Sequence, residues 1–168
     1  SRIHVIQIAY RNSDDDLVVI VCKMDKLNRL PTCLESLLSS PATEIYGVNV
    51  TADLKYIGCD FNVVELKKVD QKTRKNVHNL GMFARVRDVV QDAGAGLDLI
   101  CRRVLKVQLD KSLQCSDWSG DLSESQLDYA AVDAAVSLEA GEQLGKMPDL
   151  TRRLTPEELT PGRKVDLL

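Results

Sequence analysis

The spacing of apolar residues changes along the chain, and the first third predicts strands alternating with helix. Runs rich in β-branched residues at 2–10 and 17–22 predict two strands, joined as a hairpin by the polar turn RNSDDD at 11–16. Leucines at helical spacing predict a helix over 30–40, and the run EIYGVNV predicts a third strand at 44–50. This order is typical of an α/β domain.

The remainder of the chain is expected to be mainly helical. Thr51 is suited to cap a helix that follows the third strand. A short extended segment is expected at 62–70, and helical spacing then predicts helices around 76–90 and 94–107. The longest predicted helix covers 122–144, so the chain as a whole predicts an α/β sheet with mixed strand directions.

The long helix at 122–144 carries both a start signal and two polar residues that need explanation. Ser123 followed by Gln126 resembles a capping box. A step of 100° per residue places Tyr129 and Asp133 on one narrow stripe. The core-facing stripe is expected to contain Leu127, Ala131, Ala134 and Leu138.

The apolar pattern ends near Met147. Residues 147–168 contain three of the five prolines and no sustained period, which indicates a C-terminal extension or linker. The 168 residues suffice for one domain with a full core, which we expect to span residues 1–146.

Composition narrows the cellular setting but leaves the partners open. The net charge of −3 does not indicate nucleic-acid binding, although an acidic metal enzyme can still bind phosphates locally. Five cysteines without a CxxC pair, and two distant histidines, match no zinc spacing and indicate free thiols. No apolar run approaches the length of a membrane span and no signal peptide is visible. We therefore expect an intracellular protein, with nucleus or cytoplasm undecided.

Three groups of carboxylates are candidates for chemistry. A Tyr-x-x-x-Asp spacing such as that of Tyr129 and Asp133 is common on helix surfaces and is a weak signal by itself. Asp53 lies where a buried strand gives way to a helix, a place where ligands gather in α/β folds and where Asp also stabilises a helix start. The triple Asp14-Asp15-Asp16 is interpreted as a turn.

Three phrases taken in order add weight to these residues. VIQIA, GVNVTADLKYIGCDF and LDKSLQCSDWSGDLSESQLDYAAVDA together resemble the 3′–5′ exonuclease domain of the DnaQ-like superfamily. The resemblance is nearest to the branch containing ribonuclease D and the Werner-syndrome exonuclease domain, and it runs from about residue 2 to about 144. It implies a ribonuclease H-like mixed β-sheet flanked by helices.

The resemblance also implies a metal site with particular residues. Members of this family carry four acidic ligands in three motifs. Asp53 matches the second motif, and Tyr129 with Asp133 matches the third. The implied roles are Asp53 and Asp133 as ligands of Mg²⁺ or Mn²⁺, two ions in a complete site, and Tyr129 as the residue that orients the attacking water.

The family's first motif, an Asp-x-Glu pair on the strand before VIQIA, is not found in this chain. The domain is therefore expected to lack its first strand, either as a fragment of an active protein or as a degenerate, non-catalytic relative. If the chain is a fragment of an active protein, we expect the parent protein to hydrolyse DNA or RNA 3′ ends by a two-metal mechanism. We expect this activity to be weak or absent in the present chain alone. The alternative is an exonuclease-like nucleic-acid-binding or scaffold module, and partner domains in a longer parent protein fit both.

Lysines supply the candidate contacts to nucleic acid. The resemblance singles out Lys111, which opens the third-motif phrase, and Lys55 supplies local positive charge. Both are candidate contacts to the phosphate backbone, and a solvated charged surface is the alternative for Lys55. The basic segment KKVDQKTRK at 67–75 is interpreted either as a solvated surface or as a further backbone contact. Trp118 is interpreted as a packing anchor under its loop rather than as a base-stacking platform.

Overall fold

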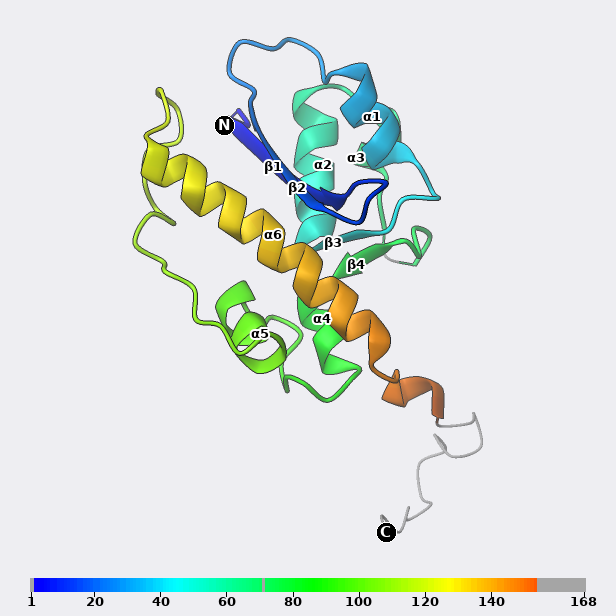
Figure 1. The fold of residues 1–168 in the computed structure, drawn as a ribbon. Coiled ribbons are helices and arrows are strands. Elements are labelled where there is room, and N and C mark those ends of the chain that lie inside the picture. Colours follow the sequence, from blue (N-terminus) through cyan, green and yellow to red (C-terminus); the bar gives the residue numbers. More distant parts are fainter. Residues whose placement is uncertain (1, 71, 154–168) are drawn as a thin grey trace.

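The computed structural model describes residues 2–70 and 72–153, and Figure 1 shows their arrangement. The elements in chain order are β1 (Val5–Arg11), β2 (Leu17–Lys23), α1 (Thr32–Ser39), β3 (Ile45–Gly47), α2 (Val50–Asp60), α3 (Val64–Lys67), β4 (Val77–Asn79), α4 (Leu80–Arg85), α5 (Leu97–Val104), α6 (Glu124–Lys146) and the 3₁₀ turn η1 (Leu150–Arg153). The mixed α/β class expected from the sequence is confirmed.

The hairpin of β1 and β2 is confirmed, and its turn is built by an asparagine. The two strands pair antiparallel from Val5 opposite Lys23 to Arg11 opposite Leu17. The Asn12 side-chain oxygen accepts hydrogen bonds from the backbone N–H groups of Asp14 (2.9 Å) and Asp16 (2.8 Å). Asp14 to Asp16 are therefore turn residues, as the sequence indicated.

The second strand pair corrects the helix expected around 76–90. Val77–Asn79 forms β4, which pairs in parallel with β3, and the helix begins only at Leu80. The Asn79 side chain accepts a hydrogen bond from the N–H of Gly81 (3.2 Å) and so marks the true helix start. A three-residue parallel strand is too short to show a period of its own, which is why helical spacing predominated in the sequence.

The extended segment expected at 62–70 is also wrong, because it contains the short helix α3. Val63, Leu66 and Val69 are all buried, with exposures of 5%, 0% and 1%. Their three-residue spacing suits a helical turn packed on the core and does not suit a strand, which alternates every two residues. Gly58 of α2 lies against this turn, where a Cβ atom would come within 2.5 Å of the Lys67 nitrogen.

Helix α6 is confirmed with its capping box, although its buried face is turned from the expected one. Ser123 Oγ accepts from the Gln126 N–H (3.2 Å), and Gln126 Oε1 accepts from the Ser123 N–H (2.9 Å). Leu127 is 41% exposed rather than buried. Gln126 is drawn inward because its amide donates to the Asp117 carbonyl (2.7 Å). The buried residues of the helix are Gln126, Ala130, Ala134, Ala140, Gly141 and Leu144.

The strands form two separate pairs, and helices hold them together. In the described residues β1 bonds only to β2, and β3 only to β4. Helix α6 packs on β1, β2 and β3, and Figure 1 shows it lying obliquely across both pairs. One core cluster joins Ile6 of β1 to Leu54 of α2 and Val77 of β4. A second joins α4, α5 and the C-terminal half of α6.

The described residues after α6 contact the fold through side-chain packing of Met147 and through a backbone hydrogen bond. The Leu150 N–H donates to the carbonyl of Val86 (2.9 Å). Residues 154–168 of the expected extension lie outside the described residues, so the boundary at 147 remains a prediction. Among the helices of the described part of the chain, none combines the length and the apolar character that crossing a membrane requires. All five cysteines are free, as expected.

A glycine permits the close approach of α6 to β3. A Cβ atom at Gly141 would lie 2.4 Å from Cγ of the Tyr46 ring. A Cβ atom at Gly145, one turn later on the same helix, would meet no other atom within 4 Å. The two glycines therefore separate the effect of packing from the effect of helix propensity.

We expect Gly141→Ala to destabilise the domain by about 1–3 kcal/mol, because the added methyl group overpacks the contact with Tyr46. Gly145→Ala is the matched control and should stabilise by up to about 1 kcal/mol through helix propensity alone. Urea unfolding followed by circular dichroism measures both. Equal effects of the two substitutions would contradict the packing role of Gly141.

Candidate active site

Tyr129 and Asp133 interact across one turn of α6. Burial raises the pKa of the Asp133 carboxyl, while a hydrogen bond from the Tyr129 hydroxyl acts in the opposite direction. Burial also raises the pKa of the Tyr129 phenol, and the charge and hydrogen bond of Asp133 add to this. At neutral pH the phenol is therefore a protonated donor, and the Asp133 carboxylate is held where its negative charge is poorly solvated.

The surroundings of this pair come from α5 and from the loop before α6. Cys101 of α5 is fully buried, and desolvation, with a contribution from the charge of Asp133, raises its pKa to about 11. The Trp118 ring lies 6.1 Å from the Tyr129 ring, centroid to centroid, at an interplanar angle of 46°. The half-buried Trp118 thus packs beside Tyr129.

Asp53 lies in the first turn of α2, directly after β3. The N-terminus of a helix ordinarily favours a charged carboxylate. Here desolvation raises the pKa of Asp53, although the residue as a whole is exposed. The cap of this helix is Asn49, with φ of 57°, and the expected cap Thr51 instead has a buried hydroxyl without a hydrogen-bond partner.

Asp53 and Asp133 therefore share one electrostatic property while lying on different helices. Each carboxyl is desolvated, and each would be stabilised by a cation. Within residues 2–70 and 72–153 no three His, Cys, Asp or Glu side chains gather as a possible metal site. The expectation that Asp53 and Asp133 share a metal ion stays a prediction, and it needs ligands beyond these two.

The lysine candidates are placed as follows. Lys55 is exposed on α2. The Lys111 ammonium is also exposed and lies 3.5 Å from the Asp98 carboxylate, which pairs with Arg102 at 2.7 Å. Within the basic segment 67–75, Arg74 is a structural residue, because its guanidinium donates to the carbonyls of Leu38 and Ser40 at 3.2 Å each.

One cationic residue near the site carries no sequence signal. Lys23, at the end of β2, contacts backbone carbonyls of the loop before α6, 95 to 97 residues away. A lysine at the end of a strand looks like an ordinary exposed residue in the sequence, and only the fold brings it to this loop.

Comparison with known proteins defines the class. The fold as a whole matches that of solved nuclease structures and is ribonuclease H-like. Nuclease NrnC from Brucella melitensis is 23% identical with a TM-score of 0.67, over 94% of this chain and 69% of that one. At this identity the likeness establishes the fold alone.

Sequence comparison then identifies the family. The family model described as 3′–5′ exonuclease matches residues 1–149. The chain belongs to this 3′–5′ exonuclease family. A 3′–5′ exonuclease of Drosophila grimshawi is 29% identical over 136 residues, which are 79% of this chain. The bifunctional 3′–5′ exonuclease/ATP-dependent helicase WRN of Mus musculus is 30% identical over 155 residues, 89% of this chain.

These relatives are considerably longer than the matched region. The chain spans 38% of the Drosophila grimshawi exonuclease and 10% of the mouse helicase. The match to the family model confirms the resemblance to 3′–5′ exonucleases that the sequence indicated. It does not extend to the activity of the whole proteins, of whose length this chain spans only a part.

We expect Asp133→Asn to raise the melting temperature at neutral pH in metal-free buffer. The pKa of Asp133 is raised in the folded state, so the protonated carboxyl favours folding. This contribution to the free energy of unfolding is lost as the pH rises through the pKa of the folded state. The gain should be a few degrees, since about 1 kcal/mol corresponds to about 2–4 °C in a domain of this size. Thermal unfolding in chelator across a pH series measures it.

The matched control is Asp128→Asn, at an exposed position on the same helix. Its effect should be small at every pH. The gain of Asp133→Asn should shrink as the pH falls toward the ordinary carboxyl range. An unchanged or lower melting temperature for Asp133→Asn at neutral pH would show that burial of this carboxyl is not the controlling effect.

Proposed function

We propose that this chain is the nuclease domain of a 3′–5′ exonuclease that hydrolyses phosphodiester bonds at DNA or RNA 3′ ends by a two-metal-ion mechanism. The observation that carries the proposal is the interacting pair of Tyr129 and Asp133 on α6, in a chain of the 3′–5′ exonuclease family. Asp53, desolvated at the start of α2, is the second carboxylate of the proposed site.

The donor chemistry of Asp53 and Asp133 fits Mg²⁺ or Mn²⁺. Both ions prefer hard carboxylate oxygens, and a bound cation would relieve the desolvation that raises the pKa of each carboxyl. When bound, two such ions supply Lewis-acid activation of the attacking water and stabilisation of the leaving 3′ oxygen.

The role proposed for Tyr129 follows from its protonated hydroxyl and from the helix and the Trp118 ring that hold its side chain. Its raised pKa keeps the hydroxyl a hydrogen-bond donor and acceptor at neutral pH. The rigid helix holds this hydroxyl one turn from Asp133, so it can orient a water beside the same scissile phosphate. Trp118 restricts the ring from the side of the preceding loop.

The remaining acidic ligands are proposed to come from a further strand. Two carboxylates leave a two-metal site short of ligands, and the described residues offer no group of three. Among the described residues the sheet is split into the β1–β2 and β3–β4 pairs, so strand edges under α6 have no backbone partner there and could pair with a further strand. A strand carrying the family's Asp-x-Glu, supplied outside residues 1–168, would join the pairs and complete the set.

Contacts with the nucleic-acid backbone are assigned to Lys55 and Lys111. Lys55 is exposed on the same helix as Asp53, and the exposed Lys111 lies 3.5 Å from Asp98, a contact that a phosphate could displace. Because such contacts are electrostatic, binding to a 3′ end should weaken as salt rises. Further domains of a longer parent protein would add partners of their own.

The test is degradation of a 5′-labelled oligonucleotide with Mn²⁺ by the protein expressed together with the coding sequence that precedes Ser1. We expect Asp133→Asn to lower the rate by roughly 10²–10³-fold, because a metal ligand is lost. Tyr129→Phe, which removes only the hydroxyl, should lower it by about 10–100-fold. Shortening from the 3′ end on a denaturing gel is the measurement.

Asp128→Asn is again the matched control and should leave the rate unchanged. Chelation of divalent ions should stop degradation, and added Mn²⁺ should restore it. Equal degradation by the protein and its Asp133→Asn variant would exclude the proposed site. Salt-dependent binding without metal-dependent degradation in any form would favour the non-catalytic binding or scaffold module.

A further inference from the structure

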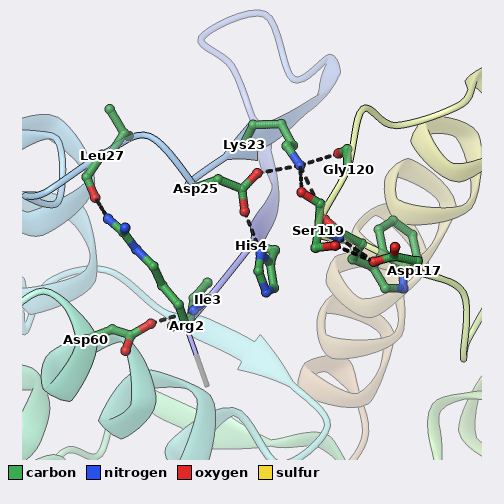
Figure 2. A network of polar contacts seen from close by, with 11 residues as sticks. Arg2, Ile3, His4, Lys23, Asp25, Leu27, Asp60, Asp117, Ser119 and Gly120 are labelled. Atoms are coloured by element: carbon green, nitrogen blue, oxygen red, sulfur yellow. Dashed lines mark hydrogen bonds and ion pairs between the residues drawn. The ribbon is translucent and has the colours of Figure 1, made fainter.

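Lys23 is the centre of a polar network that joins β2 to the loop before α6, residues 116–121, called here the Trp118 loop (Figure 2). Its ammonium donates to the carbonyls of Trp118 (3.3 Å), Ser119 (3.5 Å) and Gly120 (2.5 Å). It also pairs with the Asp25 carboxylate at 2.5 Å. The ammonium has three N–H donors for these four acceptors, so every N–H has an acceptor within the protein and at least one is shared between two oxygens.

The other oxygen of Asp25 ties this network to β1. His4, just before β1, contacts Asp25 Oδ1 through its Nδ1 at 2.5 Å. The hydrogen bond from Lys23 lowers the pKa of Asp25 most, and the hydrogen bond with His4 lowers it further. This carboxylate therefore remains charged at neutral pH. The position of Lys23 is thus set by both strands of the hairpin.

The Trp118 loop is held from its opposite side by the first turn of α6. Gln126 donates to the Asp117 carbonyl (2.7 Å) and to Ser116 Oγ (3.2 Å). The Asp117 carboxylate accepts from the N–H and the hydroxyl of Ser119, at 2.9 Å and 2.6 Å. The loop is therefore clamped between the hairpin and the helix that carries Tyr129.

The side chain that this clamp places is Trp118. Lys23 binds the carbonyl of Trp118 itself and those of the two following residues. The indole lies beside the Tyr129 ring, at 6.1 Å between centroids. A shift of the loop away from Lys23 would move the indole and free the tyrosine ring on that side.

We propose that Lys23 is a positioning residue for Tyr129, acting through the carbonyls of the Trp118 loop and the Trp118 ring. The importance of this position for hydrolysis rests on the proposed function, whereas the coupling of Lys23 to Trp118 and Tyr129 does not. Hydrogen bonds from an ammonium to carbonyls are stronger than neutral ones, and three carbonyls of one loop lie around this ammonium. An exposed ion pair with Asp25 alone would contribute little.

Tryptophan fluorescence tests the positioning directly, because Trp118 is the only tryptophan in the chain. Lys23→Met keeps the aliphatic stem and removes the donors. We expect it to raise the acrylamide quenching constant of Trp118 about twofold, because the loop opens locally. Lys23→Arg, which restores N–H donors, should return the constant most of the way. The exposed Lys26 supplies the matched control, Lys26→Met, which should leave it unchanged.

Kinetics of the longer protein used above test whether the effect passes through Tyr129. Lys23→Met should lower kcat by about 10–100-fold with little change in KM, as expected for a misplaced catalytic group. In a Tyr129→Phe background the same substitution should have little further effect, because the two residues act in series. Additive losses in this double-mutant cycle would overturn the inference, as would unchanged Trp118 quenching in Lys23→Met.

Failure of the proposed function has a different signature. In that case Tyr129→Phe and Asp133→Asn leave degradation unaltered. The quenching of Trp118 in Lys23→Met, Lys23→Arg and Lys26→Met then still decides whether Lys23 positions the loop.

Discussion

The contact on which the rest of the structure depends is the seating of α6 against the strands, made possible at Gly141. Because residue 141 has no side chain, the helix approaches the Tyr46 ring of β3 at a distance that a Cβ would forbid. The same helix packs on β1 and β2, so it spans two strand pairs that share no backbone hydrogen bonds in the described residues. Small residues at Ala130 and Ala134 continue the close contact toward the other end of the helix. Side-chain packing on α6 therefore holds the two strand pairs together. In a continuous sheet, backbone hydrogen bonds between neighbouring strands would do this.

That seating also decides the electrostatics of the candidate site. Once α6 is packed with Ala134 inward, Asp133 and Tyr129 lie on its partly buried flank, and the charge of Asp133 acts on Cys101 of α5. Burial raises the pKa of Asp133 and also that of Asp53 on α2. Desolvated carboxylates without a cation oppose folding at neutral pH, and natural proteins keep such strain where function requires it. The proposed metal site would account for the presence of two such carboxylates in this chain.

The parts of this picture that could be predicted from the sequence are those with local signals. The turn at Asn12 to Asp16, the capping box at Ser123 and the Tyr129–Asp133 stripe each follow from a few neighbouring residues. Long-range pairing had no such signal. Val77–Asn79 becomes a strand because β3 pairs with it, and residues 64–67 become a helix because three valine and leucine side chains at three-residue spacing meet the core. The inward turn of Gln126, which exposes Leu127, results from a hydrogen bond to Asp117 that periodicity alone does not reveal.

The orientation of the Tyr129 ring also depends on both local and long-range contacts. A Tyr-x-x-x-Asp pair on a helix fixes the distance between the two side chains along the axis, but it leaves the ring free to rotate on its exposed side. Trp118 limits this freedom, and its own position depends on carbonyls held by Lys23 from a different part of the chain. In the proposed site the motif supplies the reacting groups, while residues distant in sequence supply their orientation. Since orientation contributes strongly to catalysis, keeping the motif alone would not preserve the rate.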